Sequence, residues 1–164
     1  MRQIRRNIWE TNSSSTHSIS FSSTDPFEEC KIPMDEEGYL LIPMIGFCDT
    51  ELYHHQEEKL AYAVQVAAAK NGIYLNYWSS NQKTKMEESL NELYHCDTFL
   101  NIEDEVKAYV GPQCKGIRFE PDSYEGYIDD SSDYYDFSEF EADCGGIIRF
   151  VFGSSSMLHY RYTG

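Results

Sequence analysis

The feature that most constrains the fold of this chain is a long acidic segment that also carries many aromatic side chains. The segment 120–143 is rich in Asp and Glu, and no Lys or Arg occurs between Arg118 and Arg149. Tyr and Phe residues are interleaved with the carboxylates. A disordered acidic tail lacks aromatic residues because it cannot bury enough apolar area to fold. We therefore expect the rings to dock on a folded body while the carboxylates stay in water.

Such a segment predicts a fixed, strongly negative surface. Duplex DNA carries one negative charge per about 1.7 Å of its axis, and proteins bind it with arrays of Lys and Arg. A folded display of carboxylates can occupy such an array, so we expect an inhibitor that mimics DNA and binds a basic nucleic-acid groove on another protein. The residues expected to carry the charge are Asp129, Asp130, Asp133, Asp136, Glu139 and Glu141, with Tyr134, Tyr135 and Phe137 as anchors.

The overall composition is typical of a folded acidic protein that does not itself bind nucleic acid. The chain has 164 residues, 41% of them hydrophobic, and a formal net charge of −15. This length predicts a single domain over 1–164, with a basic, Ser-rich segment at 1–24 and the acidic, aromatic-rich segment at 120–143. A field of this sign repels duplex DNA and anionic membrane surfaces, so neither is an expected partner.

The cysteines and the hydropathy pattern indicate a cytoplasmic protein. The five cysteines are scattered, odd in number and never spaced as Cys-x-x-Cys. No secretory signal is recognisable at the N-terminus, and no apolar run approaches the length of about 18 residues that a membrane span needs. We therefore expect free thiols in a reducing cytosol.

The pattern of apolar and turn-forming residues predicts an α+β fold. We expect a mixed or antiparallel sheet with two main helices on one face and a C-terminal β-hairpin. Helices are expected from residue 49 to about residue 70 and over 84–95, where apolar residues recur at helical spacing behind capping residues. Segment 25–38 is expected to be a loop, and 106–110 a short strand or helical turn. Strands are expected at 17–21, 39–42, 73–78 and 117–119, with the hairpin formed by 147–152 and 157–162.

The N-terminal segment 6–19 reads Arg-Asn-Ile-Trp-Glu-Thr-Asn-Ser-Ser-Ser-Thr-His-Ser-Ile. It resembles the opening of a family of small, largely uncharacterised proteins of phages and Gram-positive bacteria. The resemblance implies a phage or mobile-element origin, in which small acidic proteins often block host defences. An anti-CRISPR protein, acting in the host cytoplasm on a Cas-type nuclease or its ribonucleoprotein, is the specific form of the inhibitor hypothesis. The simpler alternative is an acidic phage accessory protein whose charge only keeps it soluble.

Residues near the two ends of the chain allow a different function, that of a small metal-independent RNase or phosphoesterase. Segment 16–19 is partly similar to the His-x-Ser/Thr element of two-histidine phosphoesterases, and the best second copy, 159–161, lacks the hydroxyl. Metal-free RNA cleavage uses a base, an acid and a phosphate clamp, and the candidates are His17, Arg6, His159 and Arg161. In the simpler interpretation, His17 bonds a carbonyl at a strand end and His159 lies on the solvent face of an edge strand.

No cofactor or metal is expected. The chain has no glycine-rich phosphate loop and no Cys/His spacing of a zinc site. His54 and Glu58 are spaced to share an ion, but we interpret them as exposed helix residues. Segment 130–141 has the length of a calcium loop, yet Tyr135 stands where that loop requires Gly, so a loose Ca²⁺ or Mg²⁺ site is the remaining alternative there.

Overall fold

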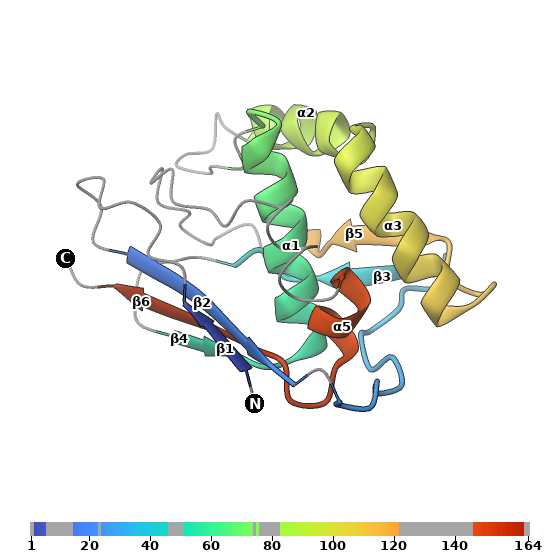
Figure 1. Ribbon diagram of the computed structural model, residues 1–164. Coiled ribbons are helices and arrows are strands. Elements are labelled where there is room, and N and C mark those ends of the chain that lie inside the picture. The colour runs from blue at the N-terminus through green and yellow to red at the C-terminus, as the bar shows by residue number, and fades with distance from the viewer. Residues whose placement is uncertain are drawn as a thin grey trace.

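The computed structural model describes residues 2–5, 15–22, 24–45, 51–73, 75, 83–121 and 146–162, and these form an α+β fold, as predicted. The strands form two separate sheets (Figure 1): an antiparallel sheet in the order β1-β2-β6-β4 and a parallel pair, β3-β5. The strands are β1 (Arg2–Arg5), β2 (Ser15–Phe21), β3 (Tyr39–Ile42), β4 (Glu51–Tyr53), β5 (Gly116–Phe119) and β6 (Met157–Tyr162). The helices are α1 (Gln56–Lys70), α2 (Lys83–Tyr94), α3 (Asp97–Val110) and α5 (Ile147–Phe152).

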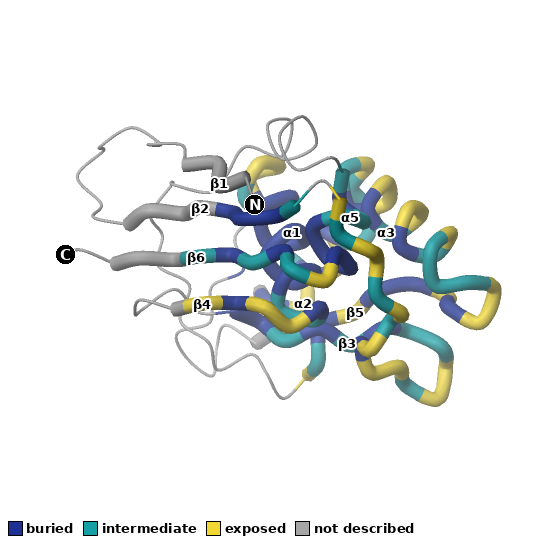
Figure 2. Tube along the Cα trace, turned by 60° about the horizontal axis from the view of Figure 1, so that its bottom comes forward, coloured by how far each residue is buried: buried dark blue, intermediate teal, exposed yellow. Residues whose placement is uncertain are grey.

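Helix α1 is the centre of the fold. It runs between the antiparallel sheet and the β3-β5 pair, and it contacts β3, α3 and α5 (Figures 1 and 2). Every residue from Lys59 to Ala68 is buried, so the helix is enclosed on all sides rather than along one stripe. Its second half is rich in alanine, as the sequence shows, and small side chains let neighbouring elements approach the helix closely.

The antiparallel sheet packs on the core through one row of side chains. The register pairs Ile19 with Leu158 and Leu158 with Tyr53, and all three side chains are buried. Residues directly opposite one another share a face of the sheet, so this row marks the core face. The strands predicted at 17–21 and 157–162 are confirmed, although the second of them pairs with β2 and β4.

Both edges of the parallel pair are closed by other parts of the chain. On the β5 side, the backbone N–H of Ile117 donates to Glu103 Oε2 at 3.0 Å, and that of Phe119 donates to the Tyr94 hydroxyl at 3.0 Å. On the β3 side, Leu41 N–H donates to the Pro33 carbonyl at 2.8 Å. Unpaired backbone groups on an edge strand can pair with a strand of another chain, so these contacts protect the small sheet from further pairing.

The predicted C-terminal hairpin is wrong, because residues 147–152 form helix α5. These residues are mostly β-branched or aromatic, so their intrinsic preference favours a strand. A strand would place Arg149 on the same face as Ile147 and Val151. In the helix the two aliphatic residues are buried, while the half-buried Arg149 guanidinium lies 5.0 Å from the centre of the Phe27 ring. Packing against α1 and α3 therefore overrides the local preference.

The first long helix begins later than predicted. Residues 51–53 form strand β4, which pairs with β6 and buries Tyr53, and α1 begins only at Gln56. His55 is the N-cap of α1, and its backbone N–H donates to Glu58 Oε2 at 3.4 Å. The capping residues at 49 and 50 favour a helix that starts there, but pairing with β6 makes residues 51–53 a strand.

The prediction of two main helices is also wrong, because the described residues form four. Helix α2 is confirmed, whereas α3 was expected only as a strand or helical turn at 106–110. Its buried residues Phe99, Ile102 and Val106 recur at helical spacing. The strands at 39–42 and 117–119 are confirmed, and the one expected at 73–78 lies mostly outside the described residues.

The buried amide of Gln65 yields the first prediction. Gln65 Oε1 accepts from Ile45 N–H and Gln65 Nε2 donates to the Ile45 carbonyl, both at 2.9 Å. Substitution Gln65→Met keeps the volume but leaves both backbone groups unpaired, so we expect the free energy of unfolding to fall by about 2–4 kcal/mol. Urea denaturation followed by circular dichroism measures the change. Asn101→Ala, at an exposed position on α3, is the control and should change stability little; equal stability of the two variants would contradict the role of Gln65.

Candidate functional site

The residues predicted from the sequence to bind a partner lie within 122–145, outside the part of the chain that the structure describes. They are Asp129, Asp130, Asp133, Asp136, Glu139, Glu141, Tyr134, Tyr135 and Phe137. The elements on either side of this stretch are described: Phe119 ends β5 and Ile147 begins α5, and both side chains are buried. The chain therefore leaves the core at β5 and re-enters it at α5.

The alternative catalytic residues come from neighbouring strands, except for Arg6, which lies outside the described residues. Strands β2 and β6 are paired, with His17 opposite Tyr160 and Ser18 opposite His159. Successive positions of a strand belong to opposite faces of a sheet, so positions 17 and 159 belong to opposite faces, whereas 159 and 161 share one. The half-buried His159 places Nε2 3.3 Å from the Ser20 hydroxyl, and Ser20 is buried.

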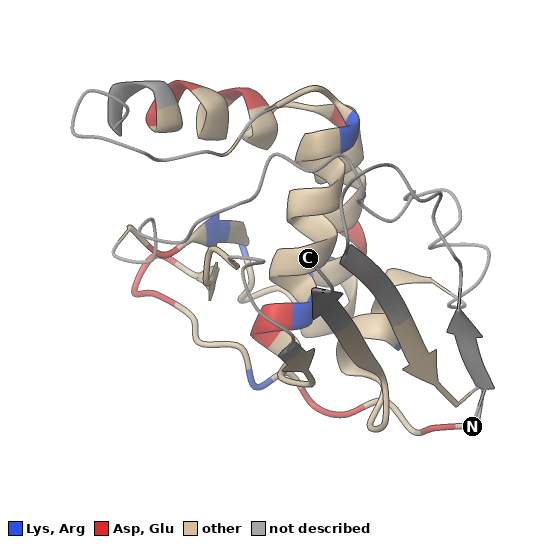
Figure 3. Ribbon diagram, turned by 90° about the vertical axis from the view of Figure 1, so that its left-hand side faces the viewer, with Lys and Arg blue, Asp and Glu red and all other residues tan. Residues whose placement is uncertain are grey.

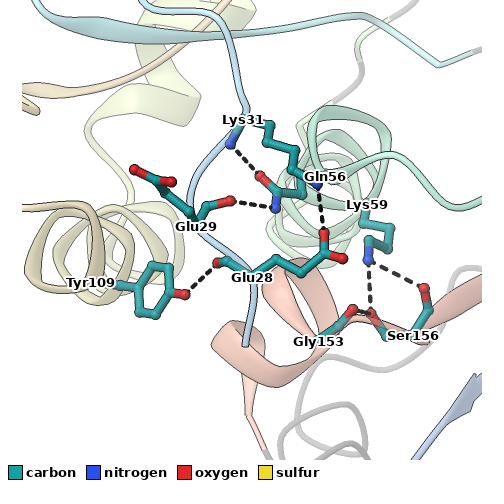
Figure 4. Close-up of polar contacts among 8 residues, drawn as sticks. All are labelled: Glu28, Glu29, Lys31, Gln56, Lys59, Tyr109, Gly153 and Ser156. Carbon is teal, nitrogen blue, oxygen red and sulfur yellow. Dashed lines mark hydrogen bonds and ion pairs between the residues drawn. The ribbon is translucent and has the colours of Figure 1, made fainter. Parts of the chain in front are cut away.

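The segment expected to be a loop crosses three helices and builds a site that the sequence does not reveal. We call residues 25–34 the strap. Its Glu28 N–H donates to the Phe152 carbonyl at 2.7 Å, at the end of α5, and its Glu28 carbonyl accepts from the Tyr109 hydroxyl of α3 at 2.5 Å. Figure 4 shows the Tyr109 hydroxyl bonded to Glu28 of the strap. Since the residues come from separate segments, no local motif could have identified them.

Gln56 fixes the strap to α1. Its Oε1 accepts from Lys31 N–H at 2.7 Å, and its Nε2 donates to the Glu29 carbonyl at 2.9 Å (Figure 4). The buried amide thus bonds the strap backbone in place of a neighbouring strand, and both of its polar ends are satisfied.

Lys59 is a buried charge at the end of α5. Its ammonium donates to Ser156 Oγ at 2.8 Å and to the Ser156 carbonyl at 3.2 Å, and its exposed fraction is 2%. Ser156 Oγ in turn lies 2.5 Å from the Phe150 carbonyl. Helix C-termini carry partial negative charge, which favours a cation there. Burial lowers the pKa of Lys59 from 10.5 to about 8, while the Glu28 carboxylate acts in the opposite direction.

The Lys59–Ser156 pair is structural rather than nucleophilic. A serine becomes a nucleophile when a neighbouring base accepts its proton. Here the ammonium donates to Oγ, and the hydroxyl proton has the Phe150 and Gly153 carbonyls as acceptors. Both side chains are also almost fully buried, so a substrate does not reach them.

A surface pocket of about 410 Å³ lies between the strap and the C-terminal end of α3. It is lined by Glu29, Cys30, Ile32, Met34, Tyr109, Val110 and Gln113. This volume is within the range of about 300–1,000 Å³ typical of ligand sites. The Tyr109 ring stacks on Phe152 at 4.3 Å between centroids, and its hydroxyl is bonded to the strap, so this wall is held in place.

The thiols near this pocket are not activated. Burial raises the pKa of Cys30 and of Cys114, so both thiols are protonated at neutral pH. The nucleophilic form of cysteine is the thiolate, which makes thiol catalysis unfavourable here. Cys30, Cys96 and Cys114 are free, as predicted, and Cys48 and Cys144 lie outside the described residues.

Charge on the described surface is predominantly negative. Figure 3 shows Asp and Glu in red on successive turns of α2, the horizontal helix at the top of the view. Several basic side chains are engaged internally: Lys31 pairs with Glu28 at 3.2 Å, and the Arg118 guanidinium lies 3.7 Å from the centre of the Tyr39 ring. The exposed carboxylates of α2 and α3 are Glu87, Glu88, Glu92, Asp97, Asp104 and Glu105.

Metal ligands do not converge in the described part of the chain, which has no group of three or more His, Cys, Asp or Glu side chains placed to hold an ion. His54 and His55 are exposed, with ring centres 4.2 Å apart, and they precede α1 instead of lying within it. Among the described helices, none has the length and apolar character to cross a membrane.

In comparisons with known proteins, no family model, no curated protein and no solved structure matches this chain.

The lowered pKa of Lys59 predicts how stability depends on pH. Between about pH 8 and pH 10.5 the unfolded chain holds a proton on Lys59 that the folded chain has released, so this residue makes the free energy of unfolding rise with pH in that window. Across the whole window, the change in Lys59 protonation raises the free energy of unfolding by about 3 kcal/mol. Lys59→Met removes it, and urea titrations from pH 7 to pH 10 measure the difference from the unsubstituted protein.

Lys70→Met is the matched control, because Lys70 is an exposed residue of the same helix. Its stability should follow the pH profile of the unsubstituted protein. A difference between Lys59→Met and the unsubstituted protein that stays constant across this range would contradict the assignment.

Proposed function

We propose that the protein is an inhibitor that docks an acidic surface on the basic, nucleic-acid-holding groove of another protein. The observation that carries this proposal is the segment 120–143, which has dense carboxylates, interleaved aromatics and no Lys or Arg. The described structure adds that β5 and α5, which flank the segment, are built into the core. An acidic segment held at both ends loses less entropy on binding than a free tail does.

The partner class follows from the charge. A chain with a net charge of −15 favours proteins that expose arrays of Lys and Arg. We propose a Cas-type nuclease or its ribonucleoprotein as this partner, since such effectors hold a heteroduplex in a positive channel and read a flanking motif with arginines. The resemblance of the N-terminal segment 6–19 suggests that this is a phage or mobile-element protein that acts in the bacterial cytoplasm.

Ionic strength and charge reversal test the proposal. Against a panel of purified RNA-guided nucleases, we expect the protein to block target-DNA binding and to lose affinity at least about tenfold between 50 and 200 mM salt, because ion pairs at such interfaces are screened and counterions are released. The triple substitution Asp129→Lys, Asp130→Lys and Asp133→Lys should abolish binding. Fluorescence anisotropy of labelled duplex measures the competition.

The matched control makes the same change in net charge elsewhere: Glu87→Lys, Glu88→Lys and Glu92→Lys on α2. If location matters, this variant keeps most of its affinity. An equal loss of affinity in both variants would show that binding depends on net charge and not on the segment 120–143. Affinity that is independent of salt and of both substitutions would rule out the acidic interface.

A further inference from the structure

The pocket between the strap and α3 has the electrostatic character of a cation site. Val110 is the last residue of α3, and the carbonyl end of a helix carries partial negative charge. Glu29 adds a carboxylate, and Lys31 does not neutralise it, because Lys31 pairs with Glu28. Burial raises the pKa of Cys30 and of Tyr109, so both stay neutral at pH 7. Glu29 is therefore the one ionised group among the seven lining residues.

The shape of the pocket favours a long side chain over a bare ion. Ile32, Met34 and the ring of Tyr109 supply apolar walls, and Met34 has 37% of its surface exposed at the rim. Figure 4 shows the Glu29 carboxylate on the side of the strap that carries Tyr109. A small metal ion needs several oxygen ligands, and the described residues bring no three acidic, His or Cys side chains together here.

We propose that this pocket binds an arginine side chain. A guanidinium is planar, weakly hydrated and able to stack on an aromatic ring, and it donates two parallel hydrogen bonds to a carboxylate. Glu29 supplies that carboxylate. Gln113 Nε2 donates to the Val110 carbonyl at 3.1 Å, which fixes this amide at the end of α3, and its Oε1 is a further acceptor in the lining. The aliphatic stem of the arginine packs on Ile32 and Met34.

The occupant we assign is an arginine of the basic partner, and this part of the inference rests on the proposed function. The preference of the pocket for a guanidinium is independent of the proposed function. A defined arginine pocket, in addition to the proposed acidic surface, provides a directional contact, because long-range charge attraction alone does not fix the orientation of a complex.

The test uses the full chain labelled with ¹⁵N and the peptide acetyl-Gly-Arg-Gly-amide as probe. We expect saturable shifts at the amides of Tyr109, Val110 and Gln113. The same peptide with citrulline, which has the shape of arginine without its charge, should produce no saturable shift there. Glu29→Gln should weaken binding at least about fivefold through loss of the charged acceptor.

Glu87→Gln is the matched control, since it removes one exposed carboxylate from α2 and not from the pocket. It should leave the affinity for the arginine peptide unchanged. Equal binding of the citrulline peptide, equal loss in both variants, or shifts confined to α2 would overturn the proposal. No macromolecular partner enters this titration, and the amides that report binding all lie at the pocket, so its failure is distinct from a failure of salt-dependent partner binding.

Discussion

Three polar side chains buried along one helix connect the parts of this fold. Gln56, Lys59 and Gln65 project from α1, and each bonds backbone from a distant segment. Buried polar groups are costly unless every donor and acceptor has a partner, and here most of the partners are backbone groups outside the strands. The helix therefore serves as a core element and as a substitute sheet edge. Removing the side-chain amide of Gln56 or Gln65 therefore leaves both a backbone N–H and a backbone carbonyl without a partner.

The same arrangement explains where the candidate pocket lies. Gln56 holds one side of the strap and Tyr109 the other, so the stretch between Glu29 and Met34 runs along the end of α3. The position of the pocket is set by the core and not by a mobile loop. A site built on fixed elements keeps its geometry before a ligand arrives, which lowers the entropic cost of binding.

Sequence patterns predicted the elements whose local signals agree with their packing. The strands at 39–42 and 117–119 and helix α2 are of this kind. Helix α5 is not, because its β-branched residues favour a strand and only contact with α1 and α3 makes it helical. The pocket also escaped prediction, since Glu29 and Tyr109 are 80 residues apart and neither belongs to a recognisable motif. The acidic segment remains a prediction, because the structure does not describe it.

The closed edges of the β3-β5 pair limit how this half of the molecule can recognise another protein. Many proteins capture a peptide by letting it join a sheet as an extra strand, which makes affinity depend on main-chain geometry and little on side-chain identity. Glu103, Tyr94 and the strap backbone already accept from backbone N–H groups that such a peptide would need. Recognition at this sheet must therefore read side chains, and the choice of partner can change through single substitutions on the surface while the backbone stays the same.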